Sequence, residues 1–176
     1  LFLILPYYQF INGDCEEFFA EVENLSLPLG RLNKTEKENV YIDYAHTPKA
    51  LESVCECLYK KKKNKLIIVF GAGGERDKGK RALMGEVADK YCEKIYITSD
   101  NPRNEDPKDI RESILKSCPS GIEIPGRKDA IIKAIDLGKK GDSVLIAGKG
   151  HEKFQIIGSK KTPFSDQETI REVIGN

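Results

Sequence analysis

The stretch Lys94-Ile95-Tyr96-Ile97-Thr98-Ser99-Asp100-Asn101-Pro102-Arg103 decides how this chain is organised. Its first half is apolar and rich in β-branched and aromatic residues, which predicts a short strand. Its second half is polar, and Asp and Asn favour turns, while Pro102 drives Asn101 toward an extended conformation. The stretch therefore predicts a strand that ends in a stiff loop, and that loop ends in Arg103.

The loop Asp100–Arg103 has two interpretations when it is considered alone. A guanidinium on a stiff loop at the end of a strand can bind a carboxylate or a phosphate through two parallel hydrogen bonds. In the other interpretation the loop is a plain turn whose arginine points into solvent, and the tetrapeptide by itself favours this one. The choice depends on the surrounding sequence.

Strand-like and helix-like segments alternate on both sides of this loop. Apolar runs predict strands at residues 40–43, 66–70, 95–98, 122–124 and 144–147. Amphipathic segments predict helices that begin at Pro48, near residue 82, at Pro107, at Lys128 and after Ser165. Such alternation predicts an α/β fold, Rossmann-like, with a mostly parallel sheet and helices on both faces.

Local signals predict several helix ends and one core face. Thr47 precedes Pro48 and is an expected N-cap, Asp106-Pro107 is expected to open another helix, and Ser165 with Glu168 has the spacing of a capping box. Gly138 is expected to end its helix in a left-handed conformation. The core face of the helix after residue 81 is expected to comprise Leu83, Met84, Val87, Ala88 and Tyr91.

Four polar loops follow four of the predicted strands. They are Asp43–Thr47, Gly71–Arg81, Thr98–Arg103 and Gly148–Glu152. In open parallel sheets ligands bind beyond the carboxyl ends of the strands. Most of the unusual polar residues lie in these four places. A ligand-binding role is therefore favoured over a plain turn as the interpretation of Asp100–Arg103.

The glycine-rich loop 71–81 suggests two motifs and fits neither of them. It lacks the third glycine of a dinucleotide fingerprint. Residues 74–80 have the G-x-x-x-x-G-K spacing of a phosphate loop, but Arg81 replaces the Ser or Thr that would hold magnesium. The loop is therefore expected to attract anionic groups in general rather than to cradle a nucleotide.

The polar loops together describe a site for an amino acid. Arg76 and Arg103 could bind carboxylates, and Glu152 could accept a hydrogen bond from an ammonium group. This set suits an amino acid with more than one carboxylate. His46 and Asp43 could form a catalytic dyad, but no nucleophile is evident. Contact with a nucleotide is the better interpretation of His46, and a structural role in the turn stays open.

Composition limits the class of protein. The chain has 176 residues with 39% hydrophobic and 32% charged residues, which fits one soluble globular domain. A net charge of +1 gives no reason to expect nucleic acid or a membrane as a partner. Five cysteines without CxxC spacing and two histidines make a metal site unexpected, and free thiols suit a reducing cytoplasm. The chain starts without Met, so a piece of a longer protein is expected.

Four motifs in order resemble the C-terminal domain of Mur ligases, of the UDP-N-acetylmuramoyl-tripeptide synthetase (MurE) type. They are Asp43–Pro48 (DYAHTP), 71–84 (GAGGERDKGKRALM), Asp100–Arg103 (DNPR) and 148–152 (GKGHE). Gly30-Arg31 resembles the segment that ends the family's central domain. The resemblance covers roughly residues 25–176 and departs from the family at Ala72 and Glu75, where Cys and Asp are expected.

This resemblance implies an activity and a set of roles. The family uses ATP to phosphorylate the γ-carboxylate of D-glutamate in UDP-MurNAc-L-Ala-D-Glu, and the amine of an incoming amino acid attacks the acyl phosphate. It implies an amino-acid pocket of Arg76, Asn101, Pro102, Arg103, Gly148 and Glu152. It also implies contacts with the nucleotide from Arg31, Asp43 and His46.

In this family an Arg at the fourth position of the DNPR loop goes with meso-diaminopimelate. A guanidinium fork would pair with the extra carboxylate of that amino acid and would repel the lone ammonium of lysine. Three alternatives remain: a lysine-adding ligase, a ligase of the folylpolyglutamate or cyanophycin type, and a non-catalytic domain that binds a small anion.

The resemblance also implies an incomplete enzyme. Residues 1–32 are expected to be a remnant of the central ATP-binding domain and a linker, and residues 33–176 the C-terminal domain. N-terminal and central domains of the same protein are expected to be missing, and ATP and Mg²⁺ would be bound mainly by the missing central domain, so the piece alone is expected to be inactive. A cytoplasmic monomer is expected.

Overall fold

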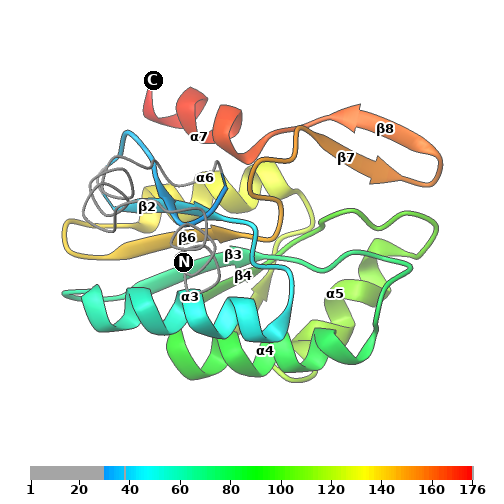
Figure 1. The fold of residues 1–176 in the computed structure, drawn as a ribbon, viewed down its shortest axis with the longest axis horizontal. Coiled ribbons are helices and arrows are strands. Elements are labelled where there is room, and N and C mark those ends of the chain that lie inside the picture. The colour runs from blue at the N-terminus through cyan, green and yellow to red at the C-terminus, as the bar shows by residue number, and fades with distance from the viewer. Residues whose placement is uncertain (1–29, 38, 176) are drawn as a thin grey trace, which may run out of the picture.

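The computed structural model describes residues 30–37 and 39–175. Most of the predicted domain remnant at 1–32 lies outside the described residues, so that boundary stays a prediction. The described part is a layered α/β domain with one large sheet and a separate two-stranded hairpin (Figure 1).

The large sheet has six strands in the order β1-β2-β6-β3-β4-β5. The strands are β1 (Asn33–Lys34), β2 (Val40–Asp43), β3 (Leu66–Phe70), β4 (Lys94–Ile97), β5 (Gly121–Glu123) and β6 (Ser143–Ala147). Strands β2 to β6 are parallel to one another, and only the edge strand β1 is antiparallel to its partner β2. The predicted mostly parallel sheet is confirmed.

Helices cover both faces of this sheet, as predicted (Figure 1). They are α3 (Pro48–Lys61), α4 (Gly79–Tyr91), α5 (Pro107–Leu115), α6 (Arg127–Leu137) and α7 (Asp166–Ile174). One core cluster joins α3, α4 and α5 to one face, and a second joins α6 and α7 to the other. The hairpin of β7 (Phe154–Ile157) and β8 (Lys160–Pro163) lies between β6 and α7 in the chain.

Strand β3 shows how one sequence serves both cores. Leu66, Ile68 and Phe70 belong to the first cluster, and Ile67 and Val69 to the second. All five are fully buried, because successive side chains of a strand point to opposite faces and both faces carry helices. The continuous apolar run is therefore explained.

The predicted N-caps at Thr47 and Ser165 are confirmed, and Asp106 also caps the helix that it was predicted to open. The side chain of Thr47 accepts a hydrogen bond from the backbone N–H of Ala50, and Asp106 accepts one from Lys108. Ser165 accepts one from Glu168 at the start of α7. Each cap satisfies an N–H group that the first turn of a helix leaves without a partner.

Two local predictions are wrong. Leu83 is 51% exposed, because α4 instead turns Met84, Ala88 and the paired guanidinium of Arg81 inward. Gly138 has φ −65°, which is not left-handed. A Cβ at this position would lie 2.8 Å from Cγ2 of Val144, so close packing of the helix end on β6 explains this glycine.

The strand order places a crevice between β3 and β6. From β3 the chain proceeds outward through β4 and β5, and it then returns across the sheet to β6 on the other side of β3. The segments that follow these two strands pack on opposite faces, since α4 belongs to the first core and α7 to the second. Such a reversal is the usual place for a ligand in this class of fold.

Candidate functional site

A pocket of about 180 Å³ lies at this reversal. All four predicted loops contribute to it, and its lining residues are Tyr44, His46, Gly71, Gly73, Arg76, Lys80, Asp100, Asn101, Arg103, Gly148 and Glu152. The structure therefore brings together Arg76, Asn101, Arg103, Gly148 and Glu152 from the predicted amino-acid site. Pro102, also predicted, is buried beside them but does not line the pocket.

The loop Asp100–Arg103 is held from outside by the hairpin. The backbone N–H of Arg103 donates to the carbonyl of Ile156 at 3.1 Å, and its carbonyl accepts from Gly158 at 2.6 Å. Arg103 has φ +55°, a left-handed conformation that a non-glycine residue rarely adopts. The surrounding hydrogen bonds hold this strained backbone in place, as is common at binding sites.

The guanidinium of Arg103 is partly occupied by the protein itself. Its Nη1 donates to the carbonyl oxygen of Gly74 at 2.9 Å and to that of Asn101 at 3.3 Å. Its Nε and Nη2 make no hydrogen bond with any described residue. Arg103 therefore ties two loops together and still has N–H groups left for a ligand.

Asn101 and Glu152 are joined through a buried lysine. Asn101 Nδ2 donates to Glu152 Oε2 at 2.9 Å. The ammonium of Lys149 donates to Asn101 Oδ1 and to Glu152 Oε2, both at 3.0 Å. Lys149 was not among the predicted site residues, although it lies two residues after the apolar run 144–147 and within the motif at 148–152.

The glycine-rich loop lies against the loop Asp100–Arg103. A Cβ on Gly74 would lie 1.9 Å from the carbonyl oxygen of Pro102, so this position accepts no larger residue without movement. The N–H of Gly74 donates to the carbonyl of Asn101 at 2.9 Å. The glycines of this loop thus permit two backbones to approach closely.

Glu105 anchors the far end of the glycine-rich loop. Its Oε1 accepts from the N–H of Glu75 at 2.5 Å, and its Oε2 accepts from the buried guanidinium of Arg81 at 2.9 Å. Arg81 occupies the position where a phosphate loop would have its Ser or Thr, and here it forms an ion pair with Glu105. The hydrogen bond from Glu75 and the charge of Arg81 lower the pKa of Glu105 below its usual 4.5.

We expect the Glu105→Gln variant to be less stable than the parent at neutral pH and equally stable in acid. A carboxylate whose pKa is lowered by folding stabilises the protein above its unfolded pKa, and this contribution disappears as pH falls below about 4.5. Denaturant unfolding between pH 7 and pH 3 measures it. Glu86→Gln, an exposed change on α4, is the control. Parallel stability profiles for parent and Glu105→Gln would refute this role.

Two further cations face the pocket. Arg76 is exposed, and Lys80 is partly buried with its ammonium 3.0 Å from the carbonyl oxygen of His46, to which it donates. Burial lowers the pKa of Lys80, and the nearby Asp100 opposes this effect. The pocket therefore presents Arg76, Lys80 and Arg103 opposite Asp100 and Glu152.

Aromatic and cationic side chains gather at the mouth of the pocket. The ring of Tyr44 lies 4.6 Å from that of His46 and 5.4 Å from that of His151, measured between centroids. The guanidinium of Arg31 lies 5.2 Å from the Tyr44 ring centroid. This exposed group offers flat surfaces and positive charge, which suit a nucleotide.

The carboxylate of Asp43 accepts hydrogen bonds from the backbone. Its two oxygens accept hydrogen bonds from the N–H groups of Leu32 and Ala45, each at 2.6 Å. His46 Nδ1 donates to the carbonyl of Tyr44 at 2.9 Å. The described contacts therefore contain no His46–Asp43 dyad, and Asp43 shapes the loop that presents His46.

Metal and membrane features are absent from the described part of the chain. Within residues 30–37 and 39–175 no three His, Cys, Asp or Glu side chains are grouped so as to hold a metal ion. Nor does this part contain a helix that is long and apolar enough to cross a membrane. The pocket residues alone thus do not fit a magnesium ion.

Curated relatives match almost the whole chain. The UDP-N-acetylmuramoyl-L-alanyl-D-glutamate–2,6-diaminopimelate ligase of Rickettsia rickettsii is 44% identical over 176 residues, which cover 98% of this chain and 36% of the relative. The ligase of the same name from Aquifex aeolicus is 50% identical over 144 residues, covering 80% and 30%. The chain thus spans about a third of the length of these relatives.

Solved structures agree with the fold. A structure of a UDP-N-acetylmuramoyl-L-alanyl-D-glutamate–2,6-diaminopimelate ligase superposes with a TM-score of 0.79 at 35% identity, covering 97% of this chain and 36% of that one. Escherichia coli FolC in complex with ADP superposes with a TM-score of 0.58 at 19% identity, which shows a shared fold alone. Residues 30–150, well over half of the chain, match the family described as Mur ligase, glutamate ligase domain. The chain belongs to this family.

Proposed function

We propose that this chain is the C-terminal, amino-acid-binding part of an ATP-dependent ligase. The ligase would add meso-diaminopimelate to UDP-MurNAc-L-Ala-D-Glu during peptidoglycan synthesis. The names of the relatives, at 44–50% identity, support the reaction. A cytoplasmic, monomeric enzyme with further N-terminal and central domains belongs to the same proposal.

The observation that carries the proposal is the charge pattern of one pocket. Arg103 and Arg76 line it together with the carboxylate of Glu152. The amino acid meso-diaminopimelate has two carboxylates and a distal ammonium, and each group finds an opposite charge here. Lysine lacks the distal carboxylate and would leave Arg103 unpaired, which disfavours it.

The proposed reaction has two steps. The γ-carboxylate of D-glutamate takes the terminal phosphoryl group of ATP, which releases ADP and leaves an acyl phosphate. The α-amine of meso-diaminopimelate, in its neutral form, attacks the acyl carbon, a C–N bond forms, and inorganic phosphate leaves as the nitrogen loses a proton. The pocket contributes by fixing the orientation of the amine, so that attack becomes effectively intramolecular.

The nucleotide would meet the mouth of the same pocket. We propose that Arg31 and His46 contact it from this side, with Asp43 holding their loops in place. Mg²⁺ would neutralise the phosphates of ATP, and its ligands would come from the other domains of the ligase.

Three alternative functions make different predictions. A lysine-adding ligase would share the fold, but lysine has no second carboxylate for the guanidinium of Arg103 to face. A folylpolyglutamate-type ligase would also share the fold, but the glutamate that it adds has two carboxylates and no distal ammonium for Glu152 to accept a hydrogen bond from. A non-catalytic domain that binds a small anion would need no ATP-binding partner domain. The sequence encoded upstream of Leu1 separates this last alternative from a ligase.

The test is a ligation assay on the protein encoded by the whole reading frame. With ATP, Mg²⁺ and UDP-MurNAc-L-Ala-D-Glu, we expect phosphate release that depends on meso-diaminopimelate, and little release with L-lysine. We also expect a G-x-x-x-x-G-K-[ST] loop upstream of Leu1. Equal turnover of the two amino acids would refute the specificity, and absence of both turnover and that loop would refute the ligase.

A further inference from the structure

Lys149 is buried in a way that its sequence context does not suggest. It lies between two glycines in a polar loop, yet it is 0% exposed. Lysine is almost never fully buried unless it is paired, because removing an ammonium from water is costly. Its only hydrogen-bond acceptors among the described residues are Asn101 Oδ1 and Glu152 Oε2.

These two contacts determine which way Asn101 points. An ammonium only donates hydrogen bonds, so the atom of Asn101 that faces Lys149 must be the oxygen. The same oxygen accepts from the N–H of Ile156 at 3.0 Å. The amide nitrogen therefore faces Glu152, to which it donates at 2.9 Å.

Lys149 also determines how Glu152 is placed. Oε2 of Glu152 belongs to a carboxylate and Oδ1 of Asn101 is the partly negative oxygen of a neutral amide, and each lies 3.0 Å from the same ammonium. Without that ammonium the two oxygens would have no common donor. Because Oε2 is used by two donors inside the protein, Oε1 is the oxygen left for a ligand.

We propose that Lys149 is the positioning residue of the amino-acid site, whose buried ammonium fixes the amide of Asn101 and the carboxylate of Glu152 for an incoming amino acid. The ligand in this inference rests on the proposed function. The positioning itself rests only on the contacts described above.

The first test is a kinetic comparison in the ligase that contains this chain. Lys149→Met keeps most of the side-chain volume and removes the charge and the donors. We expect the KM for meso-diaminopimelate to rise about 10- to 100-fold, because two acceptors lose a charged donor. The KM for ATP should change less than about threefold, since the nucleotide would bind at Arg31 and His46.

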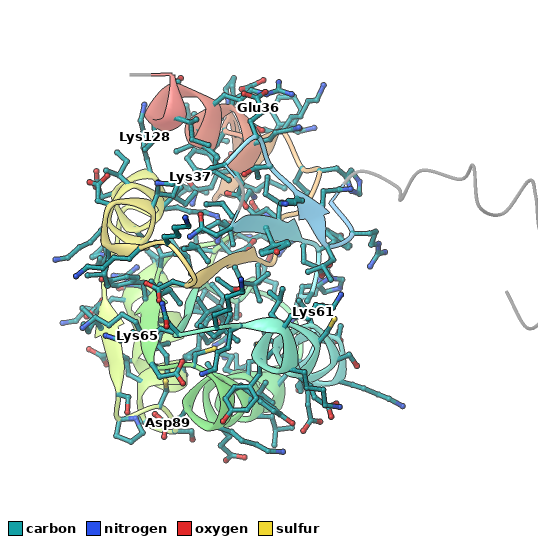
Figure 2. All side chains as sticks on the ribbon, turned by 90° about the vertical axis from the view of Figure 1, so that its left-hand side faces the viewer. Glu36, Lys37, Lys61, Lys65, Asp89 and Lys128 are labelled. Atoms are coloured by element: carbon teal, nitrogen blue, oxygen red, sulfur yellow. The ribbon has the colours of Figure 1, made fainter. Side chains whose placement is uncertain are left out.

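The control and a double variant separate positioning from general damage. Lys128 projects from the outside of α6 and pairs with Glu172 at 2.6 Å, so Lys128→Met also removes a lysine from a Lys–Glu pair (Figure 2). We expect it to leave both KM values unchanged. In a Glu152→Gln background, Lys149→Met should raise the KM by a smaller factor than in the parent, because the group that it positions is already altered.

The second test does not depend on the substrate. In the NMR spectrum of this chain, the side-chain amide of Asn101 should give two well-separated, slowly exchanging proton signals. We expect Lys149→Met to merge or broaden them and Lys149→Gln, which keeps a neutral donor, to have a smaller effect. Unchanged Asn101 signals, or an unchanged KM for meso-diaminopimelate in a folded Lys149→Met variant, would overturn the inference. If the parent shows no turnover but Lys149→Met still changes the Asn101 signals, the proposed function is refuted and the positioning role of Lys149 stands.

Discussion

Replacing Arg103 by alanine should abolish the proposed preference of the ligase for meso-diaminopimelate over lysine. We expect kcat/KM for meso-diaminopimelate to fall by about 30-fold or more, because truncating one partner of a hydrogen-bonded charge pair typically costs about 2–5 kcal/mol. With L-lysine as the substrate the change should be much smaller. The ratio of the two kcat/KM values is the measurement.

This selectivity is expected because lysine has no group for Arg103 to bind. Meso-diaminopimelate has a carboxylate where lysine has only hydrogen, and the free Nε and Nη2 of Arg103 would pair with it. Arg103 also donates to Gly74 and Asn101, so its loss loosens the loops for any substrate. That second effect should lower both kcat/KM values together and leave the ratio unchanged.

Two variants keep these effects apart. Arg103→Lys retains the charge but lacks the planar fork, and we expect it to recover only part of the preference. Arg31→Ala removes an arginine from the mouth of the pocket, so it should raise the KM for ATP and leave the ratio unchanged. If Arg103→Ala keeps the parental ratio within threefold while it remains folded, Arg103 does not select the amino acid.

The position of this site could be predicted from the sequence because its determinants are local. An apolar run followed by a polar, proline-containing loop identifies a strand end, and parallel strands bring such ends to one edge. Asn101, Arg103 and Glu152 could therefore be expected to meet although about 50 residues separate them. The loop geometry of Gly74 and Pro102 could not be predicted, because it depends on contacts at atomic distance.

The rest of the site depends on partners that no local pattern identifies. The hairpin holds Arg103 through Ile156 and Gly158, and nothing near Arg103 in the sequence indicates this. Lys149 looks like a solvated loop residue until its burial is known. Leu83 was wrongly predicted to be buried for the same reason. The face that α4 buries depends partly on the ion pair of Arg81 with Glu105, which is distant in the sequence.

One more contact between residues that are distant in the sequence supports the pocket, and its removal gives the largest loss of stability that we expect. Arg127 and Asp166 form a fully buried, two-pronged ion pair, with Nε to Oδ1 and Nη2 to Oδ2 both at 2.7 Å. Nη2 also donates to the carbonyl of Ala147 at 2.9 Å, directly before the loop that contains Lys149. Burial by itself would lower the pKa of Arg127, but the charge and hydrogen bonds of Asp166 outweigh it and raise that pKa.

We expect Arg127→Met to destabilise the fold by about 3–5 kcal/mol, because it leaves the carboxylate of Asp166 buried without its charged partner. For a domain of this size that is a fall in Tm of about 10 °C. The double variant Arg127→Met/Asp166→Leu should recover most of the loss, since a buried ion pair can be replaced by apolar groups at little cost. Thermal and denaturant unfolding of the three proteins measure this.

The exposed pair Lys128–Glu172, on the same two helices, is the matched control. Its N–O distance is also short, at 2.6 Å, but water screens it, so Lys128→Met should cost less than about 1 kcal/mol. The double variant adds a functional test. It should fold but still bind meso-diaminopimelate more weakly than the parent, because Ala147 loses the donor that anchors the start of the loop 148–152. Parental stability of Arg127→Met would show that this ion pair does not hold α6, α7 and the site together.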